Sequence, residues 1–249
     1  MHRCWLGEIA PLAVGQSVTL SAEESAHVGR VLRMKPGEPV QLIAAERLYA
    51  GELTAVGERA TVRVLAEEPS PEATARVTLV QGLPKLDKLE MIIQKATELG
   101  VWDVWPVGMA RSVARLEAGD TRKPERWNRI ALEAAKQSGR AHVPEVRPMA
   151  TLTDAVTALR EAAMDAVLVA WEEEGERALS AEMRALLTQN PNPRSLAIVI
   201  GPEGGIAPSE IERLLSTGAR CVSLGKRILR TETAGLCGLS VIMSALGEL

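Results

Sequence analysis

The sequence is poor in the side chains that build disulfide frameworks and metal sites. Its 249 residues include three cysteines and three histidines. They are Cys4, Cys221 and Cys237, and His2, His27 and His142. The cysteines form no Cys-x-x-Cys pair, and their odd number argues against a disulfide framework. Because the histidines lie far apart along the chain, we expect no zinc site and no other metal cofactor.

A long apolar run is also missing. No segment approaches the roughly 18 consecutive apolar residues that a bilayer crossing needs. The first residues, Met1–Trp5, do not lead into the apolar stretch of a signal peptide, because Glu8 and Pro11 interrupt it. These absences predict a cytoplasmic protein.

Several common catalytic motifs are absent as well. The chain contains neither GxGxxG nor GxxxxGK(S/T), the glycine loops that hold dinucleotides and nucleoside triphosphates. It also contains no GxSxG nucleophile turn and no HExxH zinc motif. We therefore do not expect redox chemistry, phosphoryl transfer or serine hydrolysis.

The residues that are present suit a folded protein. Apolar residues make up 46% and charged residues 24% of the chain, which fits one large domain or two modest ones. The net charge of −3 argues weakly against nucleic-acid binding. Residues 85–140, however, hold eleven Lys or Arg against eight Asp or Glu, a local charge of +3. This segment is either an RNA-facing surface or a set of ordinary solvated helix faces.

Residues 1–68 predict a small β-barrel with one helix. The strands are expected at Glu38–Ala44, Arg47–Val56 and Arg59–Glu67, where apolar residues partly alternate. Ser21 and Glu24 have the spacing of a capping box, which predicts a helix from Ser21 to Leu32. Residues 69–75 are rich in Pro and Glu and form a predicted linker.

Residues 76–249 alternate between apolar strands and amphipathic helices. Strands are predicted at Val77–Leu83, Val101–Val107, Asp165–Trp171, Ser195–Gly201 and Arg220–Gly225. Helices are predicted at Leu86–Gly100, Pro124–Arg140, Thr151–Ala163, Ser180–Leu187, Pro208–Thr217 and Thr231–Leu246. The pattern predicts an α/β domain whose parallel sheet is covered on both faces.

Ligands bind beyond the carboxyl ends of the strands in such sheets. Three of these ends are rich in glycine or basic residues: Val169–Trp171, Gly201–Gly205 and Leu224–Arg230. Each also has a plain structural interpretation. Gly204-Gly205 could be a simple strand-to-helix turn, and Leu224–Ala234 could be a connecting loop with an Arg–Glu ion pair.

Five segments, taken together, carry a more specific pattern. They are His27–Arg33 followed by Pro36-Gly37, Lys85–Val107, Glu125–Val146, GPEGG at Gly201–Gly205, and LGKRILRTETA at Leu224–Ala234. In this order, and over nearly the whole chain, they resemble the SPOUT methyltransferases of the RsmE type. The chain departs from that pattern at Ala45-Glu46, Ile206 and Ala207, and Ala207 removes an expected helix cap.

The resemblance implies a fold that periodicity alone does not indicate. It implies a PUA-like, RNA-binding β-barrel at residues 1–68 and a SPOUT methyltransferase domain at residues 76–249, whose chain forms a trefoil knot. Knots are otherwise very rare in proteins. The resemblance also implies a homodimer that binds S-adenosylmethionine and methylates uracil N3 in 16S rRNA, in the decoding region of the small ribosomal subunit.

The resemblance also assigns expected roles to individual residues. The catalytic candidates are Arg230, which could donate to uracil oxygens, and Glu232 and Glu203, which are candidate bases; solvent is an alternative proton acceptor. The expected cofactor-binding residues are Val169, Ala170, Gly201, Gly205, Leu224, Gly225, Ile228, Leu229, Thr233 and Ala234. The expected RNA-binding residues are His27, Arg30, Arg33, Lys85, Lys88, Arg111 and Arg140.

Two other functions remain open on the sequence. One is a different SPOUT reaction, on a ribose 2′-hydroxyl or another base. The other is an RNA-binding ribosome-assembly factor without catalysis, against which the intact LGKRILRTETA segment argues.

Overall fold

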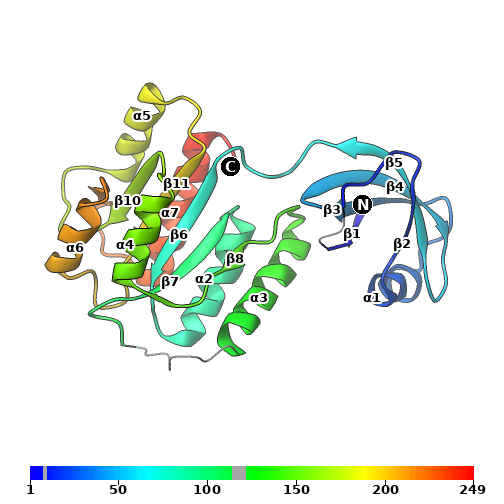
Figure 1. The fold of residues 1–249 in the computed structure, drawn as a ribbon, viewed down its shortest axis with the longest axis horizontal. Helices are drawn as coiled ribbons and strands as arrows, with labels where there is room; N and C mark the ends of the chain where they lie inside the picture. Colours follow the sequence, from blue (N-terminus) through cyan, green and yellow to red (C-terminus); the bar gives the residue numbers. More distant parts are fainter. Residues whose placement is uncertain (8–9, 114–121) are drawn as a thin grey trace. The chain divides into compact units, whose positions relative to one another are not determined.

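The chain forms two units in the computed structural model, which describes residues 1–7, 10–113 and 122–249 (Figure 1). Unit 1 comprises Met1–Glu72 together with Gly139–His142, and unit 2 comprises Ala73–Ser138 and Val143–Leu249. Within the described ranges, no helix combines the length and apolar content that a membrane crossing requires.

Unit 1 is built on a five-stranded sheet with the order β1-β3-β4-β5-β2. The strands are β1 (His2–Trp5), β2 (Ser17–Thr19), β3 (Pro39–Ala44), β4 (Arg47–Ala55) and β5 (Thr61–Glu68). β1 pairs with β3 in parallel, and the other pairs are antiparallel. Alternate residues such as Leu42, Leu53 and Val62 point inward and are fully buried, which explains the period-2 pattern of the sequence.

The predicted helix from Ser21 to Leu32 is two short pieces. α1 (Ala22–Ala26) begins at Ser21, whose hydroxyl oxygen accepts the N–H of Glu24 at 3.1 Å. The chain then widens into a π-helical segment, η1 (His27–Val31). Val28 is buried, whereas Val31 is 65% exposed, so the apolar face expected from an α-helical period is not maintained through this segment.

Unit 2 contains the predicted parallel sheet, which is confirmed. Its strand order is β12-β10-β11-β6-β7-β8, with β9 paired to β7. The strands are β6 (Arg76–Gly82), β7 (Asp103–Gly108), β8 (Glu145–Val146), β9 (Ala150–Thr151), β10 (Ala166–Ala170), β11 (Ser195–Ile200) and β12 (Arg220–Val222). Every pairing in this sheet is parallel, so the carboxyl ends of β6, β10, β11 and β12 lie along one edge.

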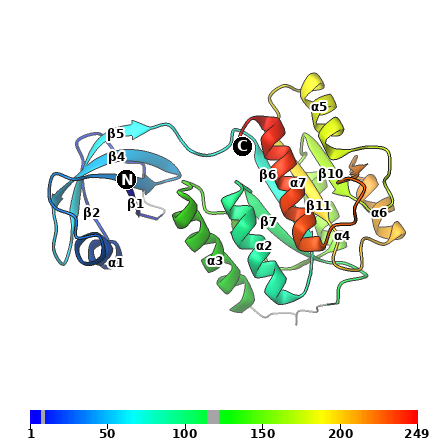
Figure 2. The same ribbon diagram turned by 180° about the vertical axis from the view of Figure 1, so that it is seen from behind.

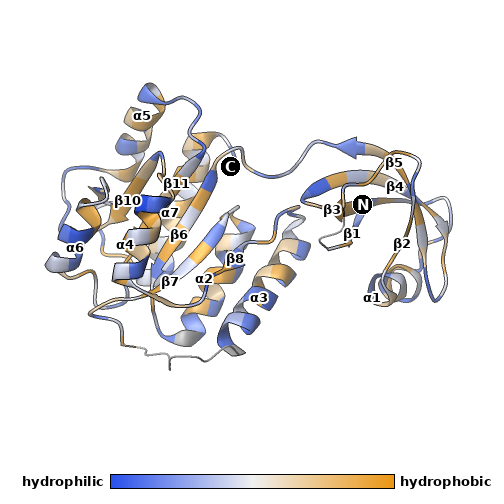
Figure 3. Cartoon of the chain, viewed as in Figure 1, coloured by the Kyte–Doolittle hydropathy of each residue, from blue (hydrophilic) through white to orange (hydrophobic). Residues whose placement is uncertain are grey.

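Helices cover both faces of this sheet (Figures 1 and 2). One layer holds α2 (Leu86–Glu98), α3 (Arg122–Ser138), α5 (Leu179–Gln189) and α7 (Thr231–Leu246), and the other holds α4 (Leu152–Glu161) and α6 (Pro208–Leu215). Successive residues of a strand face opposite helix layers. For example, Leu79 packs in the α2/α7 core and Val80 in the α4/α6 core. The apolar colouring follows these two interfaces (Figure 3). Each fully buried Leu or Val contributes about 1.5–3 kcal/mol.

The start of α6 keeps part of the cap that Ala207 was expected to remove. Glu210 Oε2 accepts the N–H of Ala207 at 3.0 Å, and Glu210 Oε1 accepts the N–H of Ala110 at 2.8 Å. Glu210 is 6% exposed, and these two bonds satisfy its buried carboxylate. The acidic side chain also lies near the positive end of the helix dipole.

Candidate active site

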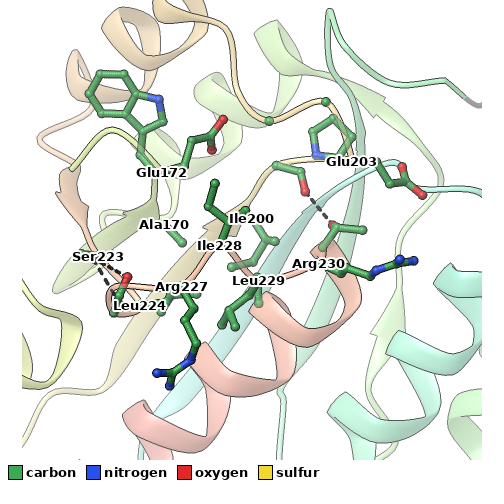
Figure 4. A pocket seen from close by; sticks show the side chains of 18 of the residues that line it. Ala170, Glu172, Ile200, Glu203, Ser223, Leu224, Arg227, Ile228, Leu229 and Arg230 are labelled. Carbon is green, nitrogen blue, oxygen red and sulfur yellow. Dashed lines mark hydrogen bonds between the residues drawn. The ribbon is translucent and has the colours of Figure 1, made fainter. Parts of the chain in front are cut away.

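A pocket of about 510 Å³ opens at the sheet edge where β10, β11 and β12 end (Figure 4). Its walls come from the three loops singled out in the sequence and from the first turns of α2 and α7. The lining residues are Lys88, Ala170–Glu172, Ile200–Gly205, Ser223–Thr231 and Ala234. All of these belong to unit 2. A cavity of this size suits a small organic ligand or cofactor.

The GPEGG loop bends sharply at Gly205, which has a φ of +72°. A Cβ atom at this position would lie 2.1 Å from Glu172 Oε1, in the loop that follows β10. The backbone conformation therefore favours glycine, and a Cβ would also require the Glu172 carboxylate to move. Gly205 thus allows the loops after β10 and β11 to meet at the pocket wall.

Thr231, the first residue of α7, connects this helix to the sheet. Its hydroxyl donates to the carbonyl oxygen of Gly201 at 2.6 Å and accepts from Gln81 Nε2 at 2.9 Å. Thr231 is 4% exposed and Gln81 is fully buried. These two bonds fix the start of α7 against the ends of β6 and β11, so they also fix the loop that precedes Thr231.

The pocket combines apolar walls with a buried donor, Trp171 Nε1. Ile200 is buried and Leu229 is half-buried, whereas Ile228 is 89% exposed. Trp171 Nε1 is buried and has no hydrogen-bond partner among the described residues. An unpaired buried N–H is unfavourable unless a ligand or a water molecule accepts it.

Three partly buried charged side chains form ion pairs beside the pocket. Lys88 Nζ is 3.3 Å from Glu203 Oε1 and 3.2 Å from Glu232 Oε2. Burial raises the pKa of Glu203, but bonds from backbone N–H groups and from Lys88 outweigh it and leave the pKa below its ordinary value. Glu203 is therefore a weaker base than an ordinary glutamate, which counts against the role expected from the sequence. The alternative Arg230–Glu232 ion pair is replaced by Lys88–Glu232.

Arg230 lies at the mouth of the pocket and is exposed. It occupies the N-cap position of α7 with an extended backbone, φ −65° and ψ 153°. Figure 4 places the side chains of Arg230 and Glu203 on the same side of the pocket, while Arg227 extends in another direction. Arg230 could therefore reach a substrate that enters from that side.

Most of the expected cofactor residues line the pocket. They are Ala170, Gly201, Gly205, Leu224, Gly225, Ile228, Leu229 and Ala234. Val169 does not, because its side chain is fully buried in the α4/α6 core, and Thr233 is exposed outside the lining. Trp171, Glu172 and Ser223 also line the pocket and were not expected as cofactor-binding residues, although Trp171 lies in one of the marked strand ends and Ser223 adjoins another. Glu232 contacts Lys88 but is not part of the lining.

The expected RNA-binding residues of unit 2 differ in their surroundings. Lys85 is exposed, and its backbone N–H donates to Glu203 Oε1 at 3.2 Å. Arg111 is exposed and donates from Nη1 to the carbonyl oxygen of Gly204 at 3.1 Å. Lys88 faces the pocket, and its ammonium group forms ion pairs with Glu203 and Glu232.

The expected RNA-binding residues of unit 1 differ in their exposure to solvent. Arg30 and Arg33 are exposed, and His27 is exposed with its ring stacked on that of His2. Arg140 is 6% exposed, and its Nη2 is 2.6 Å from Glu72 Oε2. A guanidinium in that position stabilises the structure of unit 1 and is poorly placed to contact a phosphate.

Comparisons with known proteins agree with these features. A family model described as an RNA methyltransferase domain matches residues 71–243. Ribosomal RNA small subunit methyltransferase E of Bacillus subtilis is 37% identical over 90% of this chain and 88% of the relative. The protein of the same name from Mycobacterium bovis is 35% identical, with coverages of 92% and 86%. A crystal structure of that methyltransferase from Neisseria gonorrhoeae, bound to S-adenosyl methionine, has a TM-score of 0.79 at 30% identity and covers 98% and 97%.

Proposed function

Because this chain belongs to the RNA methyltransferase family, together with ribosomal RNA small subunit methyltransferase E, we propose that it methylates uracil N3 in 16S ribosomal RNA. It is an S-adenosylmethionine-dependent ribosomal RNA methyltransferase. The observation that carries the proposal is the pocket at the carboxyl ends of β10, β11 and β12, which the GPEGG and LGKRILRTETA segments build.

The residues of the pocket suit S-adenosylmethionine. Gly201, Leu224 and Gly225 bring their backbone to the pocket wall, while Ile200 and Leu229 offer apolar surface for the adenine ring. The unpaired Trp171 Nε1 supplies a donor for a ligand oxygen or nitrogen. When bound, the cofactor supplies a methyl group already activated by its sulfonium.

Methylation at N3 requires that the uracil lose its N3 proton, so negative charge develops on O2 and O4. Arg230 is, with Lys226 and Arg227, one of the exposed cations that line the pocket, and its guanidinium can donate to these oxygens. Holding the base in line with the methyl group supplies further acceleration. Glu203 stays ionised beside Lys88, so we assign the N3 proton to solvent. Glu203 and Glu232 then act by positioning Lys88 at the pocket wall.

Exposed cations are the proposed contacts to the phosphates of the RNA. They are Arg30 and Arg33 in unit 1, and Lys85 and Arg111 in unit 2. His27 is exposed and could stack on a base, so it stays in the proposed RNA surface. Arg140 and Lys88 are not part of this proposed surface, because each forms an ion pair with glutamate.

Three further proposals concern assembly and place of action. Residues 1–68 are proposed as a PUA-like RNA-binding barrel, residues 69–75 as the linker, and residues 76–249 as a trefoil-knotted SPOUT domain; the five collinear motifs support this division. We expect a homodimer, which sedimentation of the full chain would test. The substrate is 16S rRNA or the small ribosomal subunit, so we expect the enzyme to act in the cytoplasm.

Nucleoside mass spectrometry of 16S rRNA tests the proposed reaction. RNA from cells lacking this gene should contain no N3-methyluridine, and purified enzyme with S-adenosylmethionine should restore it. Appearance of a 2′-O-methylated nucleoside instead would identify the alternative SPOUT reaction. A calorimetric titration without detectable S-adenosylmethionine binding would favour the non-catalytic assembly factor.

A further inference from the structure

Three metal-binding side chains converge in unit 1, outside the pocket. His2 and Cys4 are two residues apart on β1, so strand alternation places them on one face of the sheet. Glu24, on α1, lies against that face. His2 Nε2 is 3.7 Å from Glu24 Oε2, and one donor atom from each of the three residues lies within 4.8 Å of the others. An imidazole, a thiol and a carboxylate therefore surround one point.

The carboxylate of Glu24 is held in this position by the backbone. Its Oε1 accepts the N–H of Trp5 at 3.2 Å, which leaves Oε2 directed at His2. The hydroxyl of Ser21 accepts the N–H of Glu24 and so fixes the first turn of α1. The glutamate that the sequence marks as part of a capping box thus turns toward β1. Such outer hydrogen bonds orient the ligands in protein metal sites.

Two of the three donor groups, the His2 Nε2 atom and the Cys4 thiol, are buried. His2 Nε2 is buried and has no hydrogen-bond partner among the described residues. Cys4 is fully buried. A bound cation would satisfy the imidazole, the sulfur and the carboxylate at once.

We propose that His2, Cys4 and Glu24 bind one divalent transition-metal ion of the zinc type. Zinc accepts this mixture of nitrogen, sulfur and oxygen ligands at about 2.0–2.3 Å, so donors that now lie within 4.8 Å of one another need to close inward around it. The Cys4 thiol releases its proton to solvent as the sulfur–metal bond forms. His27 lies beside the site, because its ring stacks on His2 with 4.9 Å between centroids. Because His2, Glu24 and His27 are separated along the sequence, the sequence did not reveal that they lie close together.

The bound ion would connect β1 to α1 and stabilise unit 1, since metal binding to the folded state alone adds to folding stability. The competing explanation is an ion pair between protonated His2 and Glu24, which needs no metal and no thiolate. The two explanations differ in the bonding of Cys4 sulfur. A spectroscopic probe of that sulfur separates them.

Titration of the full chain with Co²⁺ provides this probe. A site with one thiolate ligand gives a near-ultraviolet sulfur-to-cobalt charge-transfer band at one equivalent, and Zn²⁺ should abolish it by displacement. Cys4→Ala should lose the band. The matched control is Cys237→Ala, on α7 of unit 2, which should keep it. No band, or a band that survives Cys4→Ala, would overturn the proposal.

A second variant covers the case in which Cys4→Ala does not fold. His2 is half-buried near the end of the chain, so His2→Ala should fold and bind Co²⁺ at least tenfold more weakly, with loss of one ligand. Zn²⁺ should raise the Tm of the wild type but not that of His2→Ala. Equal Tm shifts in both proteins would contradict the assignment. S-adenosylmethionine binding, measured in parallel, keeps this test separate from the proposed methyltransferase function.

Discussion

The Thr231 hydroxyl donates to the carbonyl oxygen of Gly201 at 2.6 Å, joining the start of the last helix to the loop after β11. The two residues are 30 positions apart in the sequence and belong to the two motifs that build the pocket. The same hydroxyl accepts from the buried amide of Gln81. The shape of the pocket therefore depends on one short side chain that does not itself react.

We expect Thr231→Val to weaken both folding and cofactor binding. Valine keeps the shape but removes the partner of the Gly201 carbonyl and of one Gln81 N–H, whose other N–H still donates to the Gly82 carbonyl, at a cost of about 1–3 kcal/mol for each lost bond. Denaturant unfolding measures the stability, and calorimetry measures the Kd for S-adenosylmethionine. Thr231→Ser is the matched control, because it retains the hydroxyl and should stay close to the wild type in both. Wild-type stability in Thr231→Val would show that the bond is unimportant.

Arg230→Ala should remove most of the turnover while leaving cofactor binding nearly unchanged. A donor aimed at developing negative charge contributes about 10²–10³-fold in kcat. The side chain is exposed, so the fold should survive its loss. Single-turnover methyl transfer to 16S rRNA measures the effect, and Arg227→Ala, in the same loop, is the comparison. A wild-type rate in Arg230→Ala would remove this residue from the mechanism.

Gly205→Ala should impair S-adenosylmethionine binding by tenfold or more. The new Cβ would both occupy a left-handed backbone conformation and displace Glu172 from its present position. Gly218→Ala is a suitable control, because Gly218 has a φ of +85° but no atom within 4 Å of its Cβ position. It should lose about 1 kcal/mol of stability and bind the cofactor normally. Equal affinities in the two variants would contradict the proposed wall at Gly205.

The Glu72–Arg140 pair predicts a pH-dependent stability. Burial raises the pKa of Glu72, but Arg140 and the N–H groups of Ala141 and His142 outweigh it, so the pKa lies below its ordinary 4.5. The folded form then binds fewer protons than the unfolded form. The resulting stability is complete above pH 4.5 and is lost as the pH falls through the folded pKa.

Glu72→Gln should therefore lose about 3–5 kcal/mol at pH 7 and show a smaller decrease on acidification than the wild type. Urea unfolding between pH 7 and pH 3 measures both quantities. Glu67→Gln is the control, because its partner Arg47 and Glu67 itself are about half exposed and their pair should contribute little. Parallel pH profiles for Glu72→Gln and the wild type would contradict the assigned role of Glu72.

The sequence predicted the elements whose burial is continuous. β10, and β11 after Ser195, are apolar and covered on both faces, and α7 begins and ends at the predicted Thr231 and Leu246. β8 and β9 were not predicted, since each has two residues, too few for a periodic pattern. The same limit applied to β2, which has three residues.

The site was predictable where motif residues line the pocket directly. Val169 lies outside the pocket lining because strand alternation points its side chain away from the helix layer that contains α7, and the position of a strand end does not reveal that orientation. The Lys88–Glu232 pair joins residues 144 positions apart, so the sequence offered only the nearer Arg230 as an alternative ion-pair partner of Glu232. Three-dimensional contacts of this kind require the structure.

The most direct test of the proposed function is a methyl-transfer assay. It combines recombinant enzyme with S-adenosylmethionine labelled in the methyl group and with 16S rRNA or small subunits from cells lacking the gene. We predict that the label is recovered as N3-methyluridine with the wild type and is nearly absent with Arg230→Ala. Label recovered in another nucleoside, or equal labelling by both proteins, would contradict the assignment of the pocket and of Arg230.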